Sequence, residues 1–241
     1  MQGAYSTNEM RVQGIIALSM AARALGEEAA AAANVGRTLT SWDCCKPACA
    51  WTSTLRKSSA SGSVLVCDKS DNPLSTSSGA SAASGCNKDG KGTGFLCSDY
   101  APRPVSADLS YGFAITNNSE NCCKCFELFW TDGAAAGKRM QVQVINSGGS
   151  VEAGVRQFII LTPGGGVGPN LQGCDAQFGY DWGRQYGGVT RRQDCETLPD
   201  YLQGGCYWRW NWAGGEVNGW NITYNQISCP DALTGVSGCS N

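Results

Sequence analysis

The sequence predicts a mainly β domain, a small barrel whose long loops are held together by disulfides. Three observations lead to this prediction: five short stretches rich in β-branched or aromatic residues, frequent Gly and Asn between them, and 14 cysteines among 241 residues. Short strands separated by turn residues are typical of barrels and sandwiches. Disulfides restrict the unfolded chain, so they stabilise a domain in which much of the chain is loop.

The individual elements follow from local patterns. Strands are expected at residues 110–116, 126–130, 140–146, 157–161 and 220–227. A helix is expected over 190–198 (TRRQDCETL), with Thr190 as its N-cap. Segment 58–85 has the Ser, Gly and Ala content of a linker, but Cys67 within it and Cys86 just after it predict a stapled surface loop.

Cysteines recur from about Asn34 to the end of the chain without a gap or repeat, so we expect one domain over 34–241. Residues 1–33 read as a signal peptide or N-terminal extension, because Arg11 precedes an apolar run at 12–22 that is followed by small residues. An ordinary amphipathic helix is the alternative. No apolar run reaches the ~20 residues that span a bilayer. The expected product is secreted and extracellular, has no membrane partner, and starts between Gly26 and Arg37.

Composition excludes several kinds of site. The chain has no histidine, which removes Ser-His-Asp and Cys-His nucleophiles and His-ligated zinc. A cysteine-only metal site at NCCKC (121–125) is the alternative to disulfides there, but so many cysteines in an exported chain favour disulfides. We therefore expect no metal and no cofactor. A net charge of −2 gives no basic surface for nucleic acid, and a monomer is expected.

One short run carries most of the functional information. The segment TSWDCCKPACAW (40–51) places Asp43 between a tryptophan and the first of three closely spaced cysteines. Further on come PGGGVGPNLQGCDAQFG (163–179), RQYGG (184–188) and GCYWRW (205–210). Together these runs resemble the family 45 glycoside hydrolases, which are inverting endo-β-1,4-glucanases. The resemblance covers roughly 38–239 and implies a six-stranded double-psi β-barrel with an open groove for a glucan chain.

By this resemblance, Asp43 is the general base that activates water. The local pattern agrees, since flanking cysteines hold the carboxylate still and an inverting enzyme needs a fixed base. A structural Asp that caps a turn or pairs with Lys46 is the alternative reading of the residue taken alone.

The second carboxyl is absent from its usual place. In the family the general acid stands four residues before the Pro of PGGGVG, and Ile159 occupies that position, with Phe158 and Gln157 before it. Ser150 replaces an assisting Asp, and Ser41 replaces a frequent Tyr. Glu152, in a loop about two residues longer than usual, is the candidate substitute acid, and a solvated surface Glu is its alternative. Loss of a positioned acid lowers the rate ~10²–10⁴-fold.

Aromatic residues near the motifs predict sugar binding, because flat rings stack on the apolar faces of glucose. Trp42, Trp51 and Tyr186 are the expected substrate-binding residues, and Trp51 corresponds to a groove tryptophan of the family. For Trp208 and Trp210, placed on an expected strand, core packing is as good an interpretation.

Three functions are consistent with these features. The first is a secreted cellulase-like endoglucanase acting on cellulose or another β-1,4-glucan, with activity weakened or lost because of Ile159. The second is a non-hydrolytic β-glucan-binding or expansin-like protein. The third is a cysteine-rich structural or inhibitor-like protein, for which the aromatic residues would be incidental.

The resemblance also implies a disulfide pattern, and the sequence itself contains two sequons for N-glycosylation. The pairs are Cys44–Cys174, Cys45–Cys86, Cys49–Cys122, Cys67–Cys97, Cys123–Cys239, Cys125–Cys229 and Cys195–Cys206; the spacing alone does not select this set. In a eukaryotic host, Asn117 and Asn221 are acceptors for glycans by their sequons.

Overall fold

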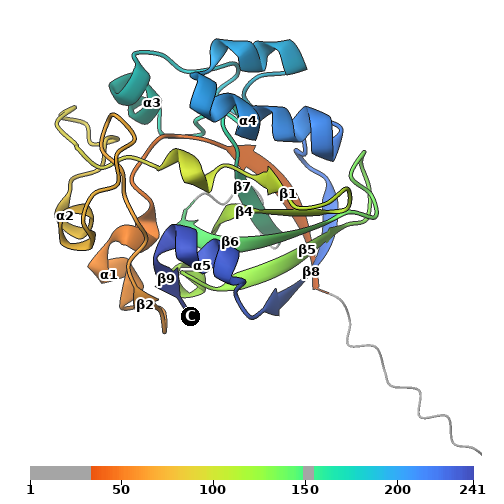
Figure 1. Ribbon diagram of the computed structural model, residues 1–241, viewed down its shortest axis with the longest axis horizontal. Coiled ribbons are helices and arrows are strands. Elements are labelled where there is room, and N and C mark those ends of the chain that lie inside the picture. Colours follow the sequence, from red (N-terminus) through yellow and green to blue (C-terminus); the bar gives the residue numbers. More distant parts are fainter. Residues whose placement is uncertain (1–33, 149–154) are drawn as a thin grey trace, which may run out of the picture. The chain divides into compact units, whose positions relative to one another are not determined.

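A closed barrel of six strands forms the centre of the computed structural model, which describes residues 34–148 and 155–241 (Figure 1). The predicted signal segment and Glu152 lie outside these residues. In chain order the elements are β1 (Asn34–Ser41), η1 (Ala48–Ala50), α1 (Thr52–Leu55), β2 (Ser61–Gly62), α2 (Thr76–Ser81), η2 (Ser98–Tyr100), β3 (Arg103–Pro104), β4 (Leu109–Thr116), η3 (Ser119–Asn121), β5 (Cys125–Trp130), β6 (Arg139–Ser147), β7 (Arg156–Leu161), α3 (Gln172–Phe178), η4 (Arg192–Thr197), α4 (Asp200–Trp208), η5 (Arg209–Ala213), β8 (Asn221–Ile227), α5 (Asp231–Ser237) and β9 (Cys239–Ser240).

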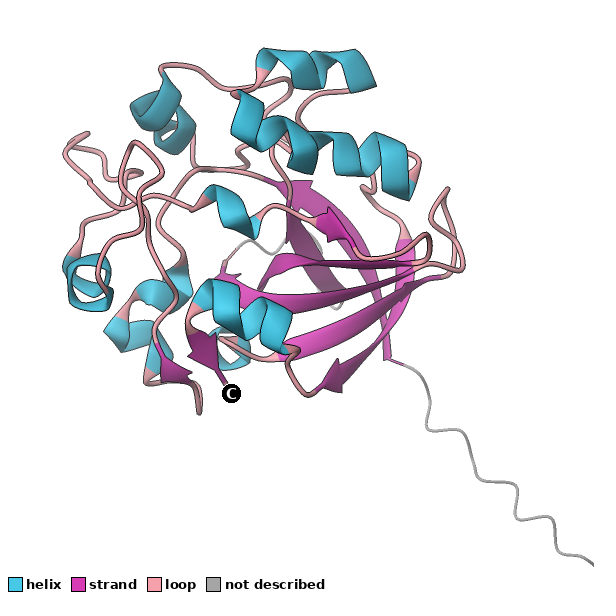
Figure 2. Cartoon of the chain, in the orientation of Figure 1, coloured by secondary structure: helices cyan, strands magenta, loops and turns pink. Residues whose placement is uncertain are grey.

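The barrel closes because its last strand returns to its first. The strand order is β3-β4-β6-β5-β8-β1-β7, and β7 also pairs with β4 through Ile115↔Ile159 and Ala114↔Ile160. The pairs β1–β7 and β4–β6 are parallel and the other barrel pairs are antiparallel. Figure 2 shows the strands grouped together, with helices and long loops around them. The six-stranded barrel that the sequence predicts is confirmed.

β1 is a strand that local pattern did not predict. Its inward positions are Gly36, Thr38 and Thr40, which are small or polar rather than hydrophobic. Thr38 is fully buried, and its hydroxyl donates to the Val217 carbonyl (2.8 Å) and accepts from Trp130 Nε1 (3.1 Å). Hydrogen bonds of this kind remove the cost of burying a polar group. The strand is therefore stabilised by its partners rather than by an apolar face.

Alternate residues of the other strands fill the barrel. Phe126, Leu128 and Trp130 of β5 share one buried cluster with Phe158 and Ile160 of β7. Side chains alternate between the two faces of a strand, so the residues between these positions face outward toward the loops. Ile159 accordingly packs against the second buried cluster, outside the barrel.

The predicted strand around Trp208–Trp210 is wrong, because this segment is helical. Leu202, Gly205, Cys206 and Arg209 are all buried and follow the spacing of one helix face across α4 and the π-helical turn η5. This periodicity prevails over the Trp-Arg-Trp alternation. Trp208 is 1% exposed and joins the cluster inside the barrel, so core packing is the correct interpretation for it.

The predicted helix over 190–198 is shorter and of another type. It is the 3-10 helix η4, and its N-cap is Arg191 rather than Thr190, without a side-chain cap bond. Pro199 follows directly after Leu198, and the residue before a proline is disfavoured in the helical conformation. The disulfide from Cys195 to Cys206 anchors this turn to α4.

All seven predicted disulfides are present, with Cα–Cα distances between 4.9 and 5.7 Å. The cysteines of the NCCKC run bind three separate partners, so a metal cluster there is ruled out in favour of disulfides. Within 34–148 and 155–241, no group of three or more His, Cys, Asp or Glu residues is arranged to hold a metal ion. The predicted loop 58–85 is stapled by Cys67–Cys97 and is followed by Cys45–Cys86.

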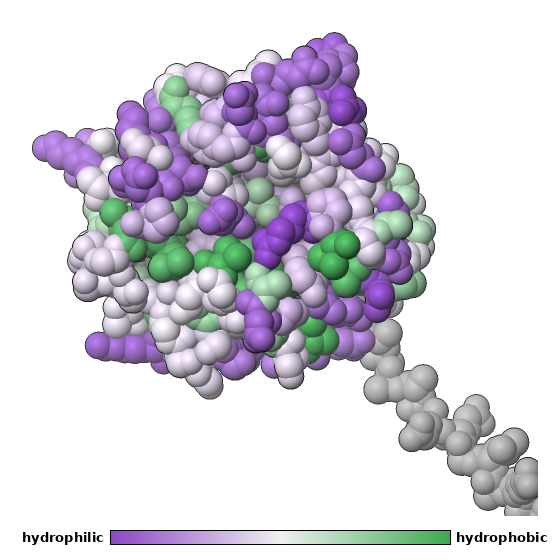
Figure 3. All heavy atoms as spheres, viewed as in Figure 1, coloured by the Kyte–Doolittle hydropathy of each residue, from purple (hydrophilic) through white to green (hydrophobic). Residues whose placement is uncertain are grey.

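The surface seen in Figure 3 is mostly hydrophilic, with hydrophobic residues in small separate spots. Spots of this kind are ordinary for a surface in contact with water. Across the described ranges, we find no helix with the length and apolar character needed to cross a membrane.

Candidate active site

A pocket of about 650 Å³ lies against the outer face of the barrel, where β1, β7 and β4 run side by side. Its floor contains Leu39, Ile159 and Ile115, which are neighbours in the sheet: Ile159 pairs with Leu39 on one side and with Ile115 on the other. Polar residues from the loops form the rest of the lining, among them Asp43 and Asn170. An apolar floor with a few fixed polar groups is typical of ligand-binding pockets.

Asp43 stands two residues after the end of β1 and is held from several directions. Cys44 and Cys45 are tied to Cys174 and Cys86, and Cys44 has a φ of 60°, which is unusual for a residue other than glycine. Asn170 Nδ2 donates to Asp43 Oδ2 at 2.8 Å, and the Cys45 amide donates to Oδ1 at 3.0 Å. The carboxylate therefore has a fixed orientation at the pocket wall.

Burial changes the acidity of this carboxyl. Asp43 is 5% exposed, and burial raises its pKa above that of an ordinary aspartate, because the charged form loses hydration. The hydrogen bonds from Asn170 and Cys45 stabilise the charged form and oppose the rise. A buried carboxylate with an elevated pKa is a common feature of acid–base sites.

Ile159 lies in the same pocket as Asp43, at the place where the resemblance puts the acid. Its register is fixed by Phe158, which is fully buried inside the barrel and packs edge-on against Phe126 at 5.2 Å. A slip of one residue would move Phe158 outward and destroy this packing. The described part of the pocket therefore presents the alkyl group of Ile159 at the position to which the resemblance assigns the acid.

Tyr186 also lines the pocket, at the tip of a tight hairpin, and is 63% exposed. Arg184 and Gly188 exchange backbone hydrogen bonds of 2.9 and 3.0 Å across this hairpin. The buried Arg209 supports it from below by donating to the carbonyls of Gly187 (3.0 Å), Gly164 (3.1 Å) and Val189 (2.9 Å). Burial lowers the pKa of Arg209 to about 10. The ring of Tyr186 is thus presented to a ligand by a well-supported turn.

The two expected tryptophans lie elsewhere. Trp42 is 2% exposed and belongs to the core, so its ring has almost no surface to offer a sugar. Trp51 is partly buried and is not among the residues that line the pocket; its ring lies 3.4 Å from Lys46 Nζ. Lys46 also donates to the carbonyls of Ala80 and Ala82 at 2.9 Å, and burial lowers its pKa to about 8. The lysine therefore pairs with Trp51 and the loop carbonyls, not with Asp43.

Several pocket residues were not predicted. Asn170 lies within the PGGGVGPN run and could have been found there, since an amide is a suitable partner for a carboxylate. Ile115 and Glu216 had no motif to mark them. Glu216 precedes Val217, a β-branched residue with a φ of 65°, a conformation that costs ~1–3 kcal/mol. Ser41, in place of the frequent Tyr, donates to the Gly166 carbonyl at 2.9 Å, and Ser150 lies outside the described residues.

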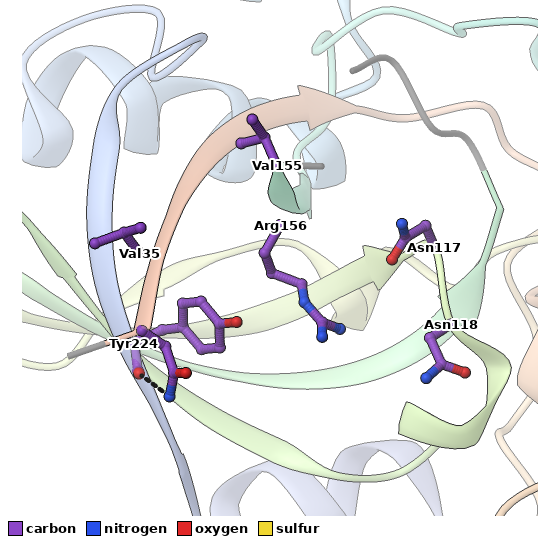
Figure 4. Close-up of a pocket in the computed structure, with 7 residues that line it drawn as sticks. Val35, Asn117, Asn118, Val155, Arg156 and Tyr224 are labelled. Atoms are coloured by element: carbon purple, nitrogen blue, oxygen red, sulfur yellow. Dashed lines mark hydrogen bonds between the residues drawn. The ribbon is translucent and has the colours of Figure 1, made fainter. Parts of the chain in front are cut away.

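A second hollow of about 540 Å³ opens near the start of β1 and β7. Figure 4 shows the Arg156 side chain pointing into the space between Tyr224 and the pair Asn117 and Asn118. None of its lining residues carries a carboxyl group. Within the described chain, this hollow therefore lacks the groups that acid–base chemistry on a sugar needs.

Comparisons with known proteins agree with the fold. Residues 35–240 match the sequence profile of glycosyl hydrolase family 45. The chain is 40% identical over 215 residues to the candidate endoglucanase type K of Fusarium oxysporum, covering 87% of this chain but only 54% of that longer protein. It is 35% identical over 212 residues to an endoglucanase of the springtail Cryptopygus antarcticus, covering 85% of this chain and 88% of the relative.

A solved structure shows the same fold. The crystal structure of the cellulase from the Antarctic springtail Cryptopygus antarcticus superposes with a TM-score of 0.77 at 33% identity, covering 88% of this chain and 99% of that one. With the barrel, the disulfide set and the Asp43 pocket in place, these matches over nearly the whole described domain show that the chain belongs to glycosyl hydrolase family 45.

Proposed function

We propose that this protein is a secreted cellulase-like enzyme that binds a β-1,4-glucan in the Asp43 pocket and hydrolyses it slowly, with inversion at the anomeric carbon. The observation that carries the proposal is the fixed, buried carboxylate of Asp43 beside an apolar floor. The endoglucanase names of its relatives support the substrate class. Binding combines stacking on Tyr186 with contact between the sugar ring and the floor.

Asp43 acts as the general base in this proposal. Its oxygens accept hydrogen bonds from Asn170 and Cys45, so only part of the carboxylate remains to hold a water molecule. That water attacks the anomeric carbon from the face opposite the leaving oxygen, and Asp43 takes its proton. Because burial raises the pKa of Asp43, its ionised form is a stronger base than an ordinary aspartate.

The usual donor position cannot donate, so the rate depends on how well another group of the pocket protonates the leaving oxygen. Ile159 has no ionisable group, and the leaving oxygen departs as an unfavourable alkoxide unless it is protonated. A positioned acid contributes ~10²–10⁴-fold, equivalent to ~3–5 kcal/mol of barrier. We therefore place the activity well below that of an enzyme with an Asp at this position.

Extracellular location follows from the same features. Every cysteine of the chain is in a disulfide, a state that persists in oxidising compartments. We infer that residues 1–33 direct export and are removed, and that the mature enzyme works as a monomer without cofactor, nucleic acid or membrane. Finding intact Met1 on the secreted protein would contradict the processing.

Release of reducing ends from a soluble β-1,4-glucan tests the activity. The wild type should release them slowly, and Asp43→Asn should remove the release altogether. Asp89→Asn is the matched control, because it makes the same change on an exposed loop. Equal rates for the wild type and Asp43→Asn would refute hydrolysis by this site.

A second candidate function is glucan binding without hydrolysis, in the manner of an expansin. The continuous floor of Leu39, Ile115 and Ile159 favours it, since aliphatic side chains suit the apolar face of a sugar but perform no chemistry. Pull-down on insoluble cellulose combined with an absence of reducing ends would support this function. Absence of both binding and hydrolysis would instead favour a cysteine-rich structural or inhibitor-like protein.

A further inference from the structure

We propose that Glu216 supplies the second carboxyl of this site and donates the proton to the leaving glycosidic oxygen. The inference rests on the proposed function and deepens it. Asp43 and Glu216 are the two residues with carboxyl groups among the described residues that line the pocket. An inverting glycosidase needs two such groups on opposite sides of the scissile bond, far enough apart to admit a water molecule.

The chain at both carboxyl-bearing residues is anchored to the same strand, β1. Thr38 Oγ1 donates to the Val217 carbonyl at 2.8 Å, and the Gly219 amide donates to the Thr38 carbonyl at 2.8 Å. The Thr40 amide donates to Asn218 Oδ1 at 2.8 Å. These bonds bind the segment that follows Glu216 to β1, and the same strand leads directly into Asp43. The backbone positions of Asp43 and Glu216 are therefore both fixed relative to one strand, as an acid–base pair requires.

An unusual backbone conformation occurs directly after each of the two carboxyl-bearing residues. In the part of the chain that the structure describes, four residues other than glycine have a positive φ, and two of them are Cys44 (60°) and Val217 (65°). Each directly follows one of the pocket carboxyls. Strained conformations of this kind persist where the surroundings impose them, and they cluster at functional sites. Val217 is fully buried and β-branched, so its conformation is especially unfavourable without such support.

The ion pair that Glu216 makes is exposed to solvent, and it must open before Glu216 can carry the proton that it donates. Its Oε2 lies 3.0 Å from Arg184 Nη2, and the two side chains are 38% and 58% exposed. Arg209 is the other cation that interacts electrostatically with Glu216. Solvent-exposed ion pairs contribute little to stability. Loss of the pair should therefore hardly affect folding, which separates a chemical role from a structural one.

The proposed step balances as a hydrolysis. The Glu216 carboxyl gives its proton to the glycosidic oxygen while the bond from that oxygen to the anomeric carbon breaks. A water oxygen bonds to the same carbon from the other face, and Asp43 takes the proton that this water loses. The products are two sugar hydroxyls, and exchange with solvent returns a proton to Glu216 and removes one from Asp43.

Leaving-group dependence tests the assignment, because a good leaving group does not need a proton donor. Glu216→Gln should lower hydrolysis of soluble β-1,4-glucan about 10²-fold while changing hydrolysis of a dinitrophenyl cellooligoside less than about 3-fold. Asp43→Asn should abolish both reactions. Glu196→Gln, the same change on an exposed residue outside the pocket, should match the wild type on both substrates.

Each other outcome has a definite meaning. If Glu216→Gln hydrolyses glucan as fast as the wild type while Asp43→Asn does not, Glu216 is not the acid, although the proposed function stands. If the wild type and Asp43→Asn are equally inactive on both substrates, the proposed function fails as well. Equal losses on both substrates, or a lower unfolding temperature for Glu216→Gln than for Glu196→Gln, would indicate a binding or structural role and overturn the assignment.

Discussion

In a Glu216→Gln background, placing an acid at position 159 should restore much of the activity that the missing donor removes. In Ile159→Asp the new carboxyl would stand on the floor of the Asp43 pocket, because backbone pairing with Leu39 and Ile115 fixes where the side chain emerges. Both neighbours are alkyl groups, and Ile115 is only 6% exposed. A carboxyl between them favours its protonated form, which is the form a general acid needs.

The size of the effect follows from the same geometry. A positioned acid contributes ~10²–10⁴-fold, and we expect the low end, ~10²-fold or ~2.7 kcal/mol of barrier, because Ile115 covers part of the new group. Adding Ile115→Ala should uncover it and raise kcat further, whereas Ile115→Ala alone should only weaken glucan binding, because Ile115 is part of the floor. Replacing the partly buried Ile159 should cost ~2–4 kcal/mol of stability, which a chain with seven disulfides can tolerate.

The assay is initial release of reducing ends from a soluble β-1,4-glucan. Measuring it in a Glu216→Gln background isolates the new donor from the one proposed above. Asp43→Asn in the same background should abolish the gain, since the two carboxyls act as a unit. An unchanged rate in folded Ile159→Asp, together with loss of the wild-type activity in Glu152→Gln, would refute the register and give the acid role to Glu152.

Three further outcomes are expected. Tyr186→Ala should weaken glucan binding about 3–10-fold by isothermal titration, because it removes the exposed ring that lines the pocket; unchanged affinity would show that Tyr186 does not stack on the sugar. Because burial raises the pKa of Asp43, the stability that this group contributes is present at low pH and is lost as the pH rises through the folded-state value. Asp43→Asn should therefore raise the unfolding temperature at pH 7 and have a smaller effect at pH 3, and the reverse order would contradict the assigned direction. In a eukaryotic host, mass spectrometry should find a glycan on the exposed Asn117 and none on Asn221, whose Nδ2 is bonded to Asp132; a glycan on Asn221 alone would show that this bond does not protect it.

The sequence predicts those parts of the fold in which the pattern of apolar and polar residues shows which side chains are buried. Strands such as β5 and β6 alternate apolar and polar residues at the period of a sheet, and they lie where the pattern places them. β1 was not predicted, because its buried residues Thr38 and Thr40 are polar. Their hydrogen-bond partners lie far along the chain, so no local pattern marks the strand. The alternation of Trp208 and Trp210 misled for the opposite reason, since helical spacing from Leu202 to Arg209 determines that segment.

The same limit applies to the site. Asp43 could be proposed because the run TSWDCCKPACAW, which carries the family resemblance, is continuous in the sequence. Glu216 could not, because it is placed at the pocket by the contacts of its neighbours with β1, which are distant in the sequence. Trp42 was misleading, since a tryptophan beside an Asp predicts a binding surface equally well whether its ring faces solvent or, as here, the core.

The anomeric form of the first product tests the central claim most directly. Proton NMR during the first minutes of cellohexaose hydrolysis, before mutarotation, distinguishes the α from the β anomer at the new reducing end. Hydrolysis by water activated at Asp43 predicts the α anomer first for the wild type and no product for Asp43→Asn. A first product in the β form, or the same product from Asp43→Asn, would contradict inversion at this site.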